Sequence, residues 1–212
     1  MNPSFAKRIA ILCNGAQSHS QKIKSRIETF PLLAAVDGGA EHCRHLGLKP
    51  HLIIGDFDSC SADLLAFFSD VPCKRFPADK DKTDLELALE ELMHPGTEEI
   101  TLFGALGNRI DHTISNIMLL SRFPGRLFIE DEQTRLFVID QKVTLSCPVG
   151  QLISLIPLNG PATDIHTEGL KWKLSGATLD KHFIGISNRA EKSQVHITVG
   201  HGDLLCCLNT SH

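Results

Sequence analysis

The chain has 212 residues, of which 42% are hydrophobic and 22% are charged, and its formal net charge is −4. This length allows one large domain or two small ones, and the apolar content suffices for a buried core, which argues against a disordered protein. The small negative net charge leaves no broad basic face, which argues against binding to nucleic acid through its phosphate backbone.

The cysteines and the apolar segments indicate the cellular location of the protein. Seven cysteines, an odd number that includes no CxxC pair, favour a reduced protein over a disulfide-bonded secreted one. The apolar run at 9–13 is too short for a secretory signal, and no stretch approaches 18 apolar residues. We therefore expect a cytoplasmic protein that does not span a membrane.

Strands and helices alternate through the first part of the chain, a pattern typical of a Rossmann-like, mostly parallel sheet with flanking helices. The predicted strands are 9–13, 32–36, 51–54, 74–76, 99–103 and 127–129. The predicted helices are 22–29, 41–46, 61–68, one that begins at Thr83, and one that ends at Leu120.

The second predicted strand stops at Asp37-Gly38-Gly39. Two glycines permit a tight turn and let a ligand approach the backbone just before a helix begins. Open α/β sheets bind their ligands at such strand ends, although a simple turn would explain the glycines equally well.

The third predicted strand is followed by the segment GDFDS, in which Asp56 and Asp58 lie two residues apart. Residues at this spacing point the same way in an extended chain, so the pair predicts two carboxylates side by side. Such carboxylates repel each other unless a cation or hydrogen-bond donors neutralise them, and paired oxygen ligands suit Mg²⁺. A loop with two solvated acids is the alternative.

Thr83 and Glu86 form a capping-box pattern, which predicts that a helix begins at Thr83. As a cap and a first-turn acid, Thr83 and Asp84 need no further role. The lysines just upstream could meet phosphates or simply be solvated. The helix start does not explain why so many charges precede it, namely Asp79, Lys80, Asp81 and Lys82.

The predicted strand at 99–103 is followed by a glycine loop and a helix, which the segment from Gly104 to His112 opens. This order is a phosphate-binding context. Neither a Walker A nor a GxGxxG pattern occurs in the sequence. Arg109 could hold phosphate oxygens in a bidentate manner. His112 is more readily a structural group than an acid or base. The helix is predicted to turn its apolar residues inward, namely Ile110, Ile114, Ile117 and Met118.

From about residue 126 short β-rich runs separated by Gly, Pro and Asn replace the helical periodicity, which predicts a C-terminal antiparallel β-sandwich. We place the boundary near residue 133, with an α/β domain over 1–133 and the sandwich over 134–212. In the run at 170–174, the alternation places Trp172 on the same side of the predicted strand as the leucines, which favours a core position. The alternative is that Trp172 forms a stacking surface for a ligand. The predicted strands are 136–139, 143–147, 152–157, 170–174, 183–187, 195–199 and 204–208.

Six motifs along nearly the whole chain, in the family's order, resemble the thiamine pyrophosphokinase family. They are DGGA at 37–40, Pro50 followed by IGDFDS at 54–59, KDKTDLELAL at 80–89, GALGNRIDH at 104–112 with Asn116, TEGLKWKL at 167–174 and GISN at 185–188.

The resemblance implies transfer of a diphosphoryl group from ATP to the hydroxyl of thiamine, which gives thiamine diphosphate and AMP and requires Mg²⁺. It implies five catalytic acids, of which the first three would hold the metal: Asp37, Asp56, Asp58, Asp81 and Asp84. Nucleotide contacts would come from Gly38, Gly39, Lys82, Thr83, Gly107, Arg109, Asp111, His112 and Asn116. Thiamine would contact Trp172, Ser187 and Asn188. The family also implies a homodimer whose sites are shared between subunits.

Two alternatives to this activity stay open at this point. Another Mg²⁺-dependent transferase that uses a DxD site on a nucleotide-activated donor would explain the acids, but not TEGLKWKL and GISN. The other alternative is a non-catalytic thiamine or nucleotide sensor, and the five acids argue against it because a binding module has little use for such mutually repulsive groups.

Overall fold

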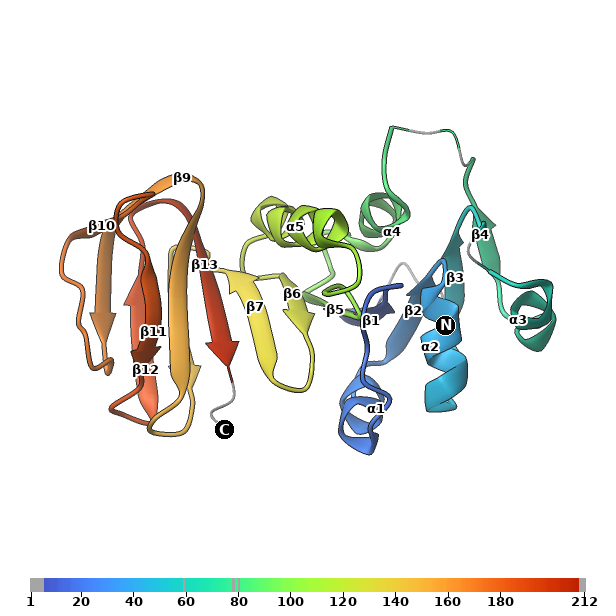
Figure 1. The fold of residues 1–212 in the computed structure, drawn as a ribbon, viewed down its shortest axis with the longest axis horizontal. Coiled ribbons are helices and arrows are strands. Elements are labelled where there is room, and N and C mark those ends of the chain that lie inside the picture. The colour runs from blue at the N-terminus through green and yellow to red at the C-terminus, as the bar shows by residue number, and fades with distance from the viewer. Residues whose placement is uncertain (1–5, 59, 78, 80, 210–212) are drawn as a thin grey trace. The chain divides into compact units, whose positions relative to one another are not determined.

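The computed structural model describes residues 6–58, 60–77, 79 and 81–209. Ser59 and Lys80, which belong to two of the family motifs, lie outside the described residues. The chain divides into two compact units (Figure 1): unit 1 comprises Met1–Asn116 and Ile129–Glu132, and unit 2 comprises Ile117–Phe128 and Gln133–His212.

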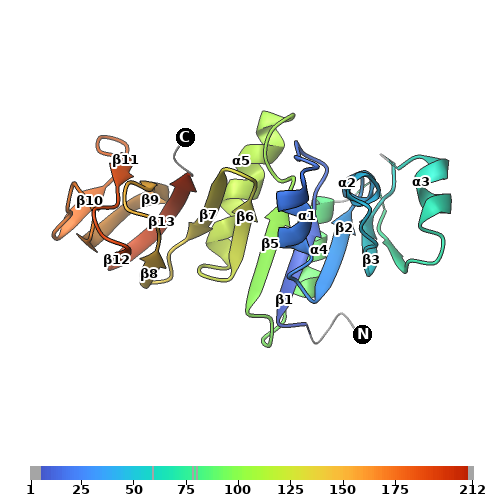
Figure 2. The same cartoon turned by 90° about the horizontal axis from the view of Figure 1, so that it is seen from below.

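Unit 1 is built on a sheet whose paired strands β1 to β5 run parallel, in the order β4-β3-β2-β1-β5, with β6 following β5. Figure 2 shows β5, β1, β2 and β3 side by side. The chain builds the sheet outward from β1 in one direction and then returns to add β5 on the other side, so the strand order reverses between β1 and β5. The strands are β1 (Arg8–Leu12), β2 (Leu32–Val36), β3 (Leu52–Gly55), β4 (Cys73–Arg75), β5 (Glu99–Phe103) and β6 (Leu127–Glu130).

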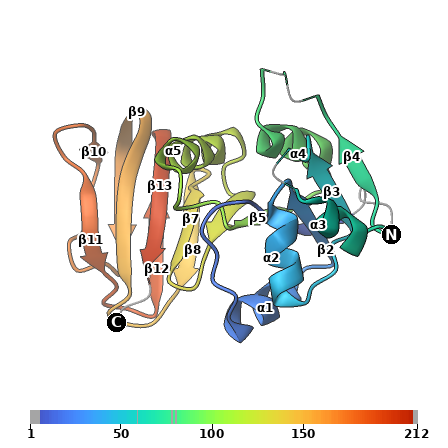
Figure 3. The same ribbon diagram turned by 45° about the vertical axis from the view of Figure 1, so that its right-hand side comes forward.

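Helices cover both faces of this sheet. Buried side chains of α1, α2 and α3 pack with one set of alternating strand residues, and Figure 3 shows α1 and α2 on the near side of the strands. The other set, which includes Ile9, Ile11 and Ile54, is also buried, and α4 contacts β2 and β3 there. The helices are α1 (Gln21–Ile27), α2 (Gly39–Leu46), α3 (Ala62–Phe67), α4 (Asp84–Leu92) and α5 (Ile110–Leu119).

Side-chain caps mark where α3 and α4 begin. The Ser61 side chain accepts a hydrogen bond from the backbone N–H of Leu64 at the start of α3. At the start of α4, Thr83 and Glu86 make both bonds of a capping box, as the sequence predicted. Among the described residues, no helix has the length and apolar character needed to cross a membrane.

The prediction that α5 turns its apolar residues inward is wrong for three of the four. Ile110 is 73% exposed, Ile114 is 54% exposed and Met118 is 53% exposed, whereas Leu119 is the residue of this helix that is buried. Helical spacing shows which residues share a face, but it does not show whether the chain's own core covers that face.

Unit 2 is built from antiparallel strand pairs around one apolar core that includes Ile165, Val195 and Leu204. The long strand β9 has different partners along its length, since β11 pairs with its first part and β10 and β12 pair with its last part. The strands are β7 (Thr134–Val138), β8 (Lys142–Ser146), β9 (Leu152–Glu168), β10 (Ala177–Leu179), β11 (Gly185–Arg189), β12 (Gln194–Thr198) and β13 (His201–Asn209).

The predicted strand at 170–174 is a loop, so this prediction is wrong, and so is the core position of Trp172, which is 54% exposed. Gly169 adopts a left-handed conformation with φ of 81° at the end of β9, which turns the chain out of the ladder. Leu170 then makes only an isolated bridge to Ala190. Strand alternation therefore does not apply to Trp172.

Candidate functional site

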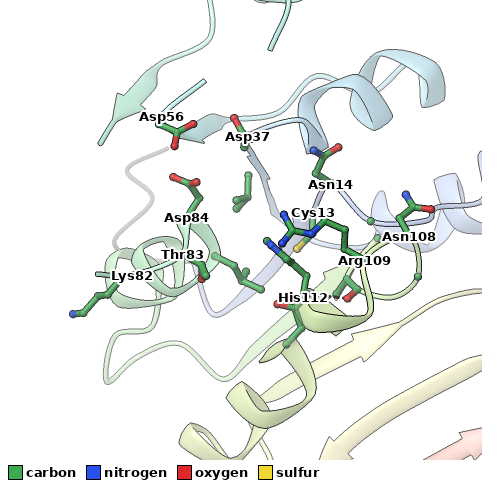
Figure 4. A pocket seen from close by; sticks show the side chains of 17 residues that line it. Cys13, Asn14, Asp37, Asp56, Lys82, Thr83, Asp84, Asn108, Arg109 and His112 are labelled. Carbon is green, nitrogen blue, oxygen red and sulfur yellow. Dashed lines mark hydrogen bonds between the residues drawn. The ribbon is translucent and has the colours of Figure 1, made fainter. Parts of the chain in front are cut away.

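A cavity of about 450 Å³ opens in unit 1 at the carboxyl ends of β1, β2, β3 and β5. It lies where the strand order reverses between β1 and β5, the place at which open α/β sheets bind ligands. Figure 4 shows the side chains that line it. The lining residues are Cys13, Asn14, Gly15, Val36, Asp37, Asp56, Lys82, Thr83, Asp84, Leu85, Gly104, Ala105, Gly107, Asn108, Arg109, His112 and Asn116.

Backbone segments at the base of this cavity approach each other too closely for side chains. A Cβ atom at Gly39 would lie 2.0 Å from the carbonyl oxygen of Leu12, so α2 can begin against the end of β1 only with glycine there. Gly15 donates its backbone N–H to the carbonyl of Gly104 at 2.7 Å, which joins the loops after β1 and β5. A Cβ atom at Gly38 would likewise clash with the side chain of Asn14, which lines the cavity. Gly38 and Gly39 thus shape the site although they lie outside its described lining.

Three carboxylates from three different elements face the cavity. Asp37 follows β2 with φ of 49°, and its backbone N–H still donates to Ile54 at 2.8 Å. Asp56 follows β3, and Asp84 opens α4. Figure 4 shows the three carboxylates gathered on one side of the cavity. Like charges gathered in this way favour a bound cation.

The expectation that Asp56 and Asp58 point the same way does not hold, because the chain between them is not extended. Phe57 has φ of 68°, and the Asp58 N–H donates to the Asp56 carboxylate at 3.0 Å, which closes a tight turn. Asp56 therefore lines the cavity, while Asp58 is exposed and lies outside the described lining. Positive φ is costly for a bulky residue and is tolerated here because the Phe57 side chain is buried in the core.

The start of α4 brings Thr83 and Asp84 to the cavity, and Lys82 just before it also lines the cavity but makes an ion pair elsewhere. Lys82 pairs with Glu90 at 2.6 Å, and Figure 4 shows its ammonium group pointing away from the three carboxylates. Asp81 is exposed and lies outside the described lining.

The loop after β5 and the first turns of α5 form the opposite wall. Asn116 donates its side-chain N–H to the carbonyl of Ala105 at 2.8 Å, and Thr113 accepts from the N–H of Gly107 at 3.0 Å. These bonds hold the glycine loop against the helix start, where backbone N–H groups and the helix dipole favour anions.

Arg109 supplies a guanidinium group to this wall and is paired with Asp111. The Arg109 Nε donates to Asp111 at 3.2 Å. Their hydrogen bond raises the pKa of Arg109 and lowers the pKa of Asp111. Asp111 itself is exposed and lies outside the cavity lining as described, whereas His112 lies within it.

The donor chemistry fits Mg²⁺ that arrives with a phosphate substrate. Among the described residues, no group of three or more His, Cys, Asp or Glu side chains is arranged to hold a metal ion by itself. Mg²⁺ does not need such a cage, since it commonly takes one or two carboxylates and completes its shell with waters and substrate phosphates. Asp37 and Asp56 are suitable oxygen ligands, with Asp84 beside them.

The lining also contains three polar or thiol residues that were not among the predicted site residues: Cys13, Asn14 and Asn108. Asn14 had a usable signal, because it stops the first strand at the edge where Asp37 and Asp56 also lie. Burial raises the pKa of the Cys13 thiol to about 12, so this group is neutral and a poor metal ligand at physiological pH.

The three residues predicted to contact thiamine lie in unit 2. The indole of Trp172 is exposed, and the Lys171 ammonium lies 4.8 Å from its ring centroid. Ser187 is exposed, has φ of 60° and donates its backbone N–H to the Ser154 hydroxyl at 3.0 Å. Asn188 is only 8% exposed, and its amide bonds to the backbone of Trp172.

Fold and site together define a two-unit protein of a recognisable class: an α/β unit with an acidic, metal- and phosphate-compatible cavity at its sheet reversal, followed by an antiparallel β unit with an exposed indole. Residues 23–130 match the family model of the thiamin pyrophosphokinase catalytic domain, and residues 138–204 match that of the thiamin pyrophosphokinase vitamin B1 binding domain. The chain belongs to the thiamine pyrophosphokinase family.

Individual relatives agree with this assignment. Thiamine pyrophosphokinase 1 of Oryza sativa subsp. japonica is 30% identical over 182 residues, which cover 79% of this chain and 68% of the relative. Thiamine pyrophosphokinase of Bacillus subtilis (strain 168) is 26% identical over 176 residues, which cover 80% of this chain and 82% of the relative.

Solved structures share the fold along nearly the whole chain. The crystal structure of thiamine pyrophosphokinase from Bacillus subtilis superposes with a TM-score of 0.86 at 23% identity and covers 97% of this chain and 100% of that chain. That of thiamin pyrophosphokinase from Geobacillus thermodenitrificans superposes with a TM-score of 0.83 at 27% identity and covers 96% and 98%. The predicted fold class, a mostly parallel α/β sheet followed by an antiparallel β part, is confirmed.

Proposed function

We propose that this chain transfers the β- and γ-phosphoryl groups of ATP as one unit to the hydroxyl of thiamine, which gives thiamine diphosphate and AMP. Membership of the family supports the reaction. The observation that carries it in this chain is the convergence of Asp37, Asp56 and Asp84 opposite the start of α5. A site of this kind has acids for a metal on one wall and anion-binding groups on the other.

Within this reaction the acids hold and orient the metal–nucleotide complex. Asp37, Asp56 and Asp58 are the proposed Mg²⁺ ligands, and Asp81 and Asp84 would complete the acidic rim and orient metal-bound waters. When bound, Mg²⁺ would neutralise charge on the transferring phosphoryl oxygens. Asp58 and Asp81 lie outside the described lining and would have to turn toward the nucleotide.

The opposite wall would hold the phosphates. Arg109 would exchange the Asp111 carboxylate for phosphate oxygens, and a guanidinium group can bind them in a bidentate manner. The glycine loop and the first turn of α5 would contribute backbone N–H groups, and the remaining nucleotide contacts are those named for the family: Gly38, Gly39, Lys82, Thr83, Gly107, Asp111, His112 and Asn116.

Unit 2 would hold thiamine, with Trp172 as the stacking surface and Ser187 as a polar contact. The exposed indole favours this role over the core position predicted from strand alternation. Asn188, the other polar contact that the family resemblance implies, has its amide bonded to the Trp172 backbone instead. We further propose a cytoplasmic homodimer in which each active site draws on both subunits, with 1–133 as the catalytic domain and 134–212 as the thiamine-binding domain.

Identification of the nucleotide product tests the proposal. The protein is incubated with thiamine, ATP and Mg²⁺, and the nucleotides are separated by chromatography. AMP that forms only when thiamine is present supports diphosphoryl transfer. ADP would indicate a simple kinase, and absence of turnover would favour the sensor.

A further inference from the structure

The loop that carries Trp172 has no strand partner of its own. Residues 169–176 lie between β9 and β10, and within them Leu170 makes an isolated bridge to Ala190. Lys171 donates its backbone N–H to Arg189 at 2.9 Å. On the other side of Trp172, Leu174 accepts from the backbone N–H of Thr167 at 3.0 Å and donates its own N–H to the Thr167 hydroxyl at 2.9 Å. The loop is therefore tied to β11 and to β9, and the contacts at Trp172 itself orient that residue between the two ties.

The side chain of Asn188, on β11, makes those contacts. Its Oδ1 accepts from the Trp172 backbone N–H at 3.1 Å, and its Nδ2 donates to the Trp172 backbone carbonyl at 2.7 Å. The N–H and the C=O of one residue are thus both bound by one planar amide. This two-point contact fixes the orientation of the Trp172 backbone more tightly than a single bond would.

The same amide has little capacity left for a ligand. Its Oδ1 also accepts from the Arg189 N–H at 2.8 Å, so both acceptor positions of the oxygen and one of the two N–H groups are in use. The residue is 8% exposed, whereas the indole that it supports is 54% exposed. Asn188 is therefore poorly placed to form a hydrogen bond with a substrate and well placed to hold Trp172.

We infer that Asn188 is a positioning residue, which keeps the Trp172 indole in place as a preformed stacking surface for the aromatic substrate without touching that substrate itself. The inference rests on the proposed function, in which Trp172 stacks against thiamine. Pre-organisation of this kind strengthens binding, because the ordering of the loop does not have to occur on association. Without the amide, the N–H and C=O of Trp172 would turn to water and the indole would sample several orientations.

The tryptophan itself reports on its position, since the chain contains one. Asn188→Ala should lower the steady-state fluorescence anisotropy of Trp172 and increase its quenching by acrylamide in the free protein. Asn188→Asp keeps the acceptor oxygens and loses the donor to the Trp172 carbonyl, so it should fall between wild type and Asn188→Ala. Ser187→Ala is the matched control, because the Ser187 backbone bond to Ser154 survives the change, and it should leave both readings as in wild type.

Kinetics then separate positioning from direct contact. Asn188→Ala should raise the KM for thiamine roughly tenfold while changing kcat and the KM for ATP less than about twofold. In a Trp172→Ala background the same substitution should add almost nothing to the KM for thiamine, because its effect passes through the indole. A direct contact would instead give additive losses.

Unchanged anisotropy and quenching in Asn188→Ala, or additive losses in the double variant, would overturn the inference. If Asn188→Ala does not fold, Asn188→Asp carries both tests. The fluorescence measurements need no turnover, so they decide the positioning role even if the wild-type protein fails to convert thiamine, an outcome that would refute the proposed function alone.

Discussion

The cavity of unit 1 and the Trp172 surface of unit 2 are held in place by different means. The cavity is fixed mainly by the backbone, through strand ends, the capped start of α4 and glycines such as Gly39 that admit no side chain. The backbone of Trp172, by contrast, lies in a loop and is bonded by the side-chain amide of Asn188. Chemistry on charged phosphates needs rigid geometry, whereas a flat ligand needs one well-oriented face.

The largest effect should follow from removing charge in the cavity. Asp56→Asn should lower kcat at least about a hundredfold, because the lost charge acts mainly on the transition state. Thermal stability without Mg²⁺ should hold or rise, since like-charge repulsion is reduced. Steady-state kinetics together with thermal denaturation check both parts, and near-normal turnover would remove Asp56 from the mechanism.

Asp58→Asn provides a comparison for Asp56→Asn, because Asp58 is two residues from Asp56 in the sequence but lies outside the described lining. As a proposed Mg²⁺ ligand it should also lower kcat about a hundredfold, and raising the Mg²⁺ concentration should restore part of the loss. A loss below about threefold would exclude Asp58 as a ligand and leave Asp37 and Asp56.

The indole of Trp172 should contribute to the binding of thiamine and not to the binding of ATP. Trp172→Ala should weaken thiamine binding by roughly 1 to 3 kcal/mol and leave ATP binding nearly unchanged, as measured by calorimetric titration. Trp172→Phe keeps an aromatic face and should lose less. Equal weakening of both ligands, or an unfolded protein, would refute the separate role of this surface.

A mixed dimer tests whether the two regions act across subunits. Asp56→Asn and Trp172→Ala chains are co-expressed and assayed at thiamine well below the KM of the tryptophan variant. Random assortment gives about half heterodimers, in each of which one site carries both defects and the other carries none, so activity should recover to about a quarter of wild type. Heterodimers confirmed by mass spectrometry but without recovered activity would show that each site lies within one chain.

The smallest effect concerns a histidine pair that supports the loop after β1. His19 bonds to His42 at 2.9 Å, and His42 bonds to the carbonyl of Gly15 at 2.9 Å. Burial lowers the pKa of both rings. The unfolded chain therefore binds more protons below about pH 6.5, so this contribution to stability is present above that pH and is lost as the pH falls.

His42→Gln removes one of these titrating groups and can still donate to Gly15. Its melting temperature should fall less steeply than that of wild type between about pH 7 and pH 5. Calorimetric scans across this range check the slope, and an identical slope in both proteins would mean that the pair does not contribute.

Sequence reasoning succeeded where a local rule determines the structure. The bounds of β5 and the capping box of α4 were predicted correctly, because buried apolar runs and caps depend on adjacent residues. It also placed Asp37 and Asp56 at the edge where the cavity lies, since carboxyl ends of parallel strands meet there.

Predictions from the sequence were wrong where contacts between distant parts of the chain determine the structure. Alternating residues at 170–174 suggested a strand, but the partner of Trp172 is a side chain sixteen residues away. The apolar stripe of α5 was found, but not that it would be exposed. The turn at Phe57, which separates Asp58 from Asp56, depends on burial of the phenylalanine ring in a core that the local sequence does not reveal.

The central claim is that the β- and γ-phosphoryl groups leave ATP together and arrive on thiamine. To test this directly, the protein is incubated with thiamine, Mg²⁺ and ATP that carries a radioactive γ-phosphorus, and the products of a single turnover are separated. We expect the label in thiamine diphosphate, together with unlabelled AMP. Label in thiamine monophosphate beside ADP, or in inorganic pyrophosphate beside a nucleotidylated thiamine, would contradict it.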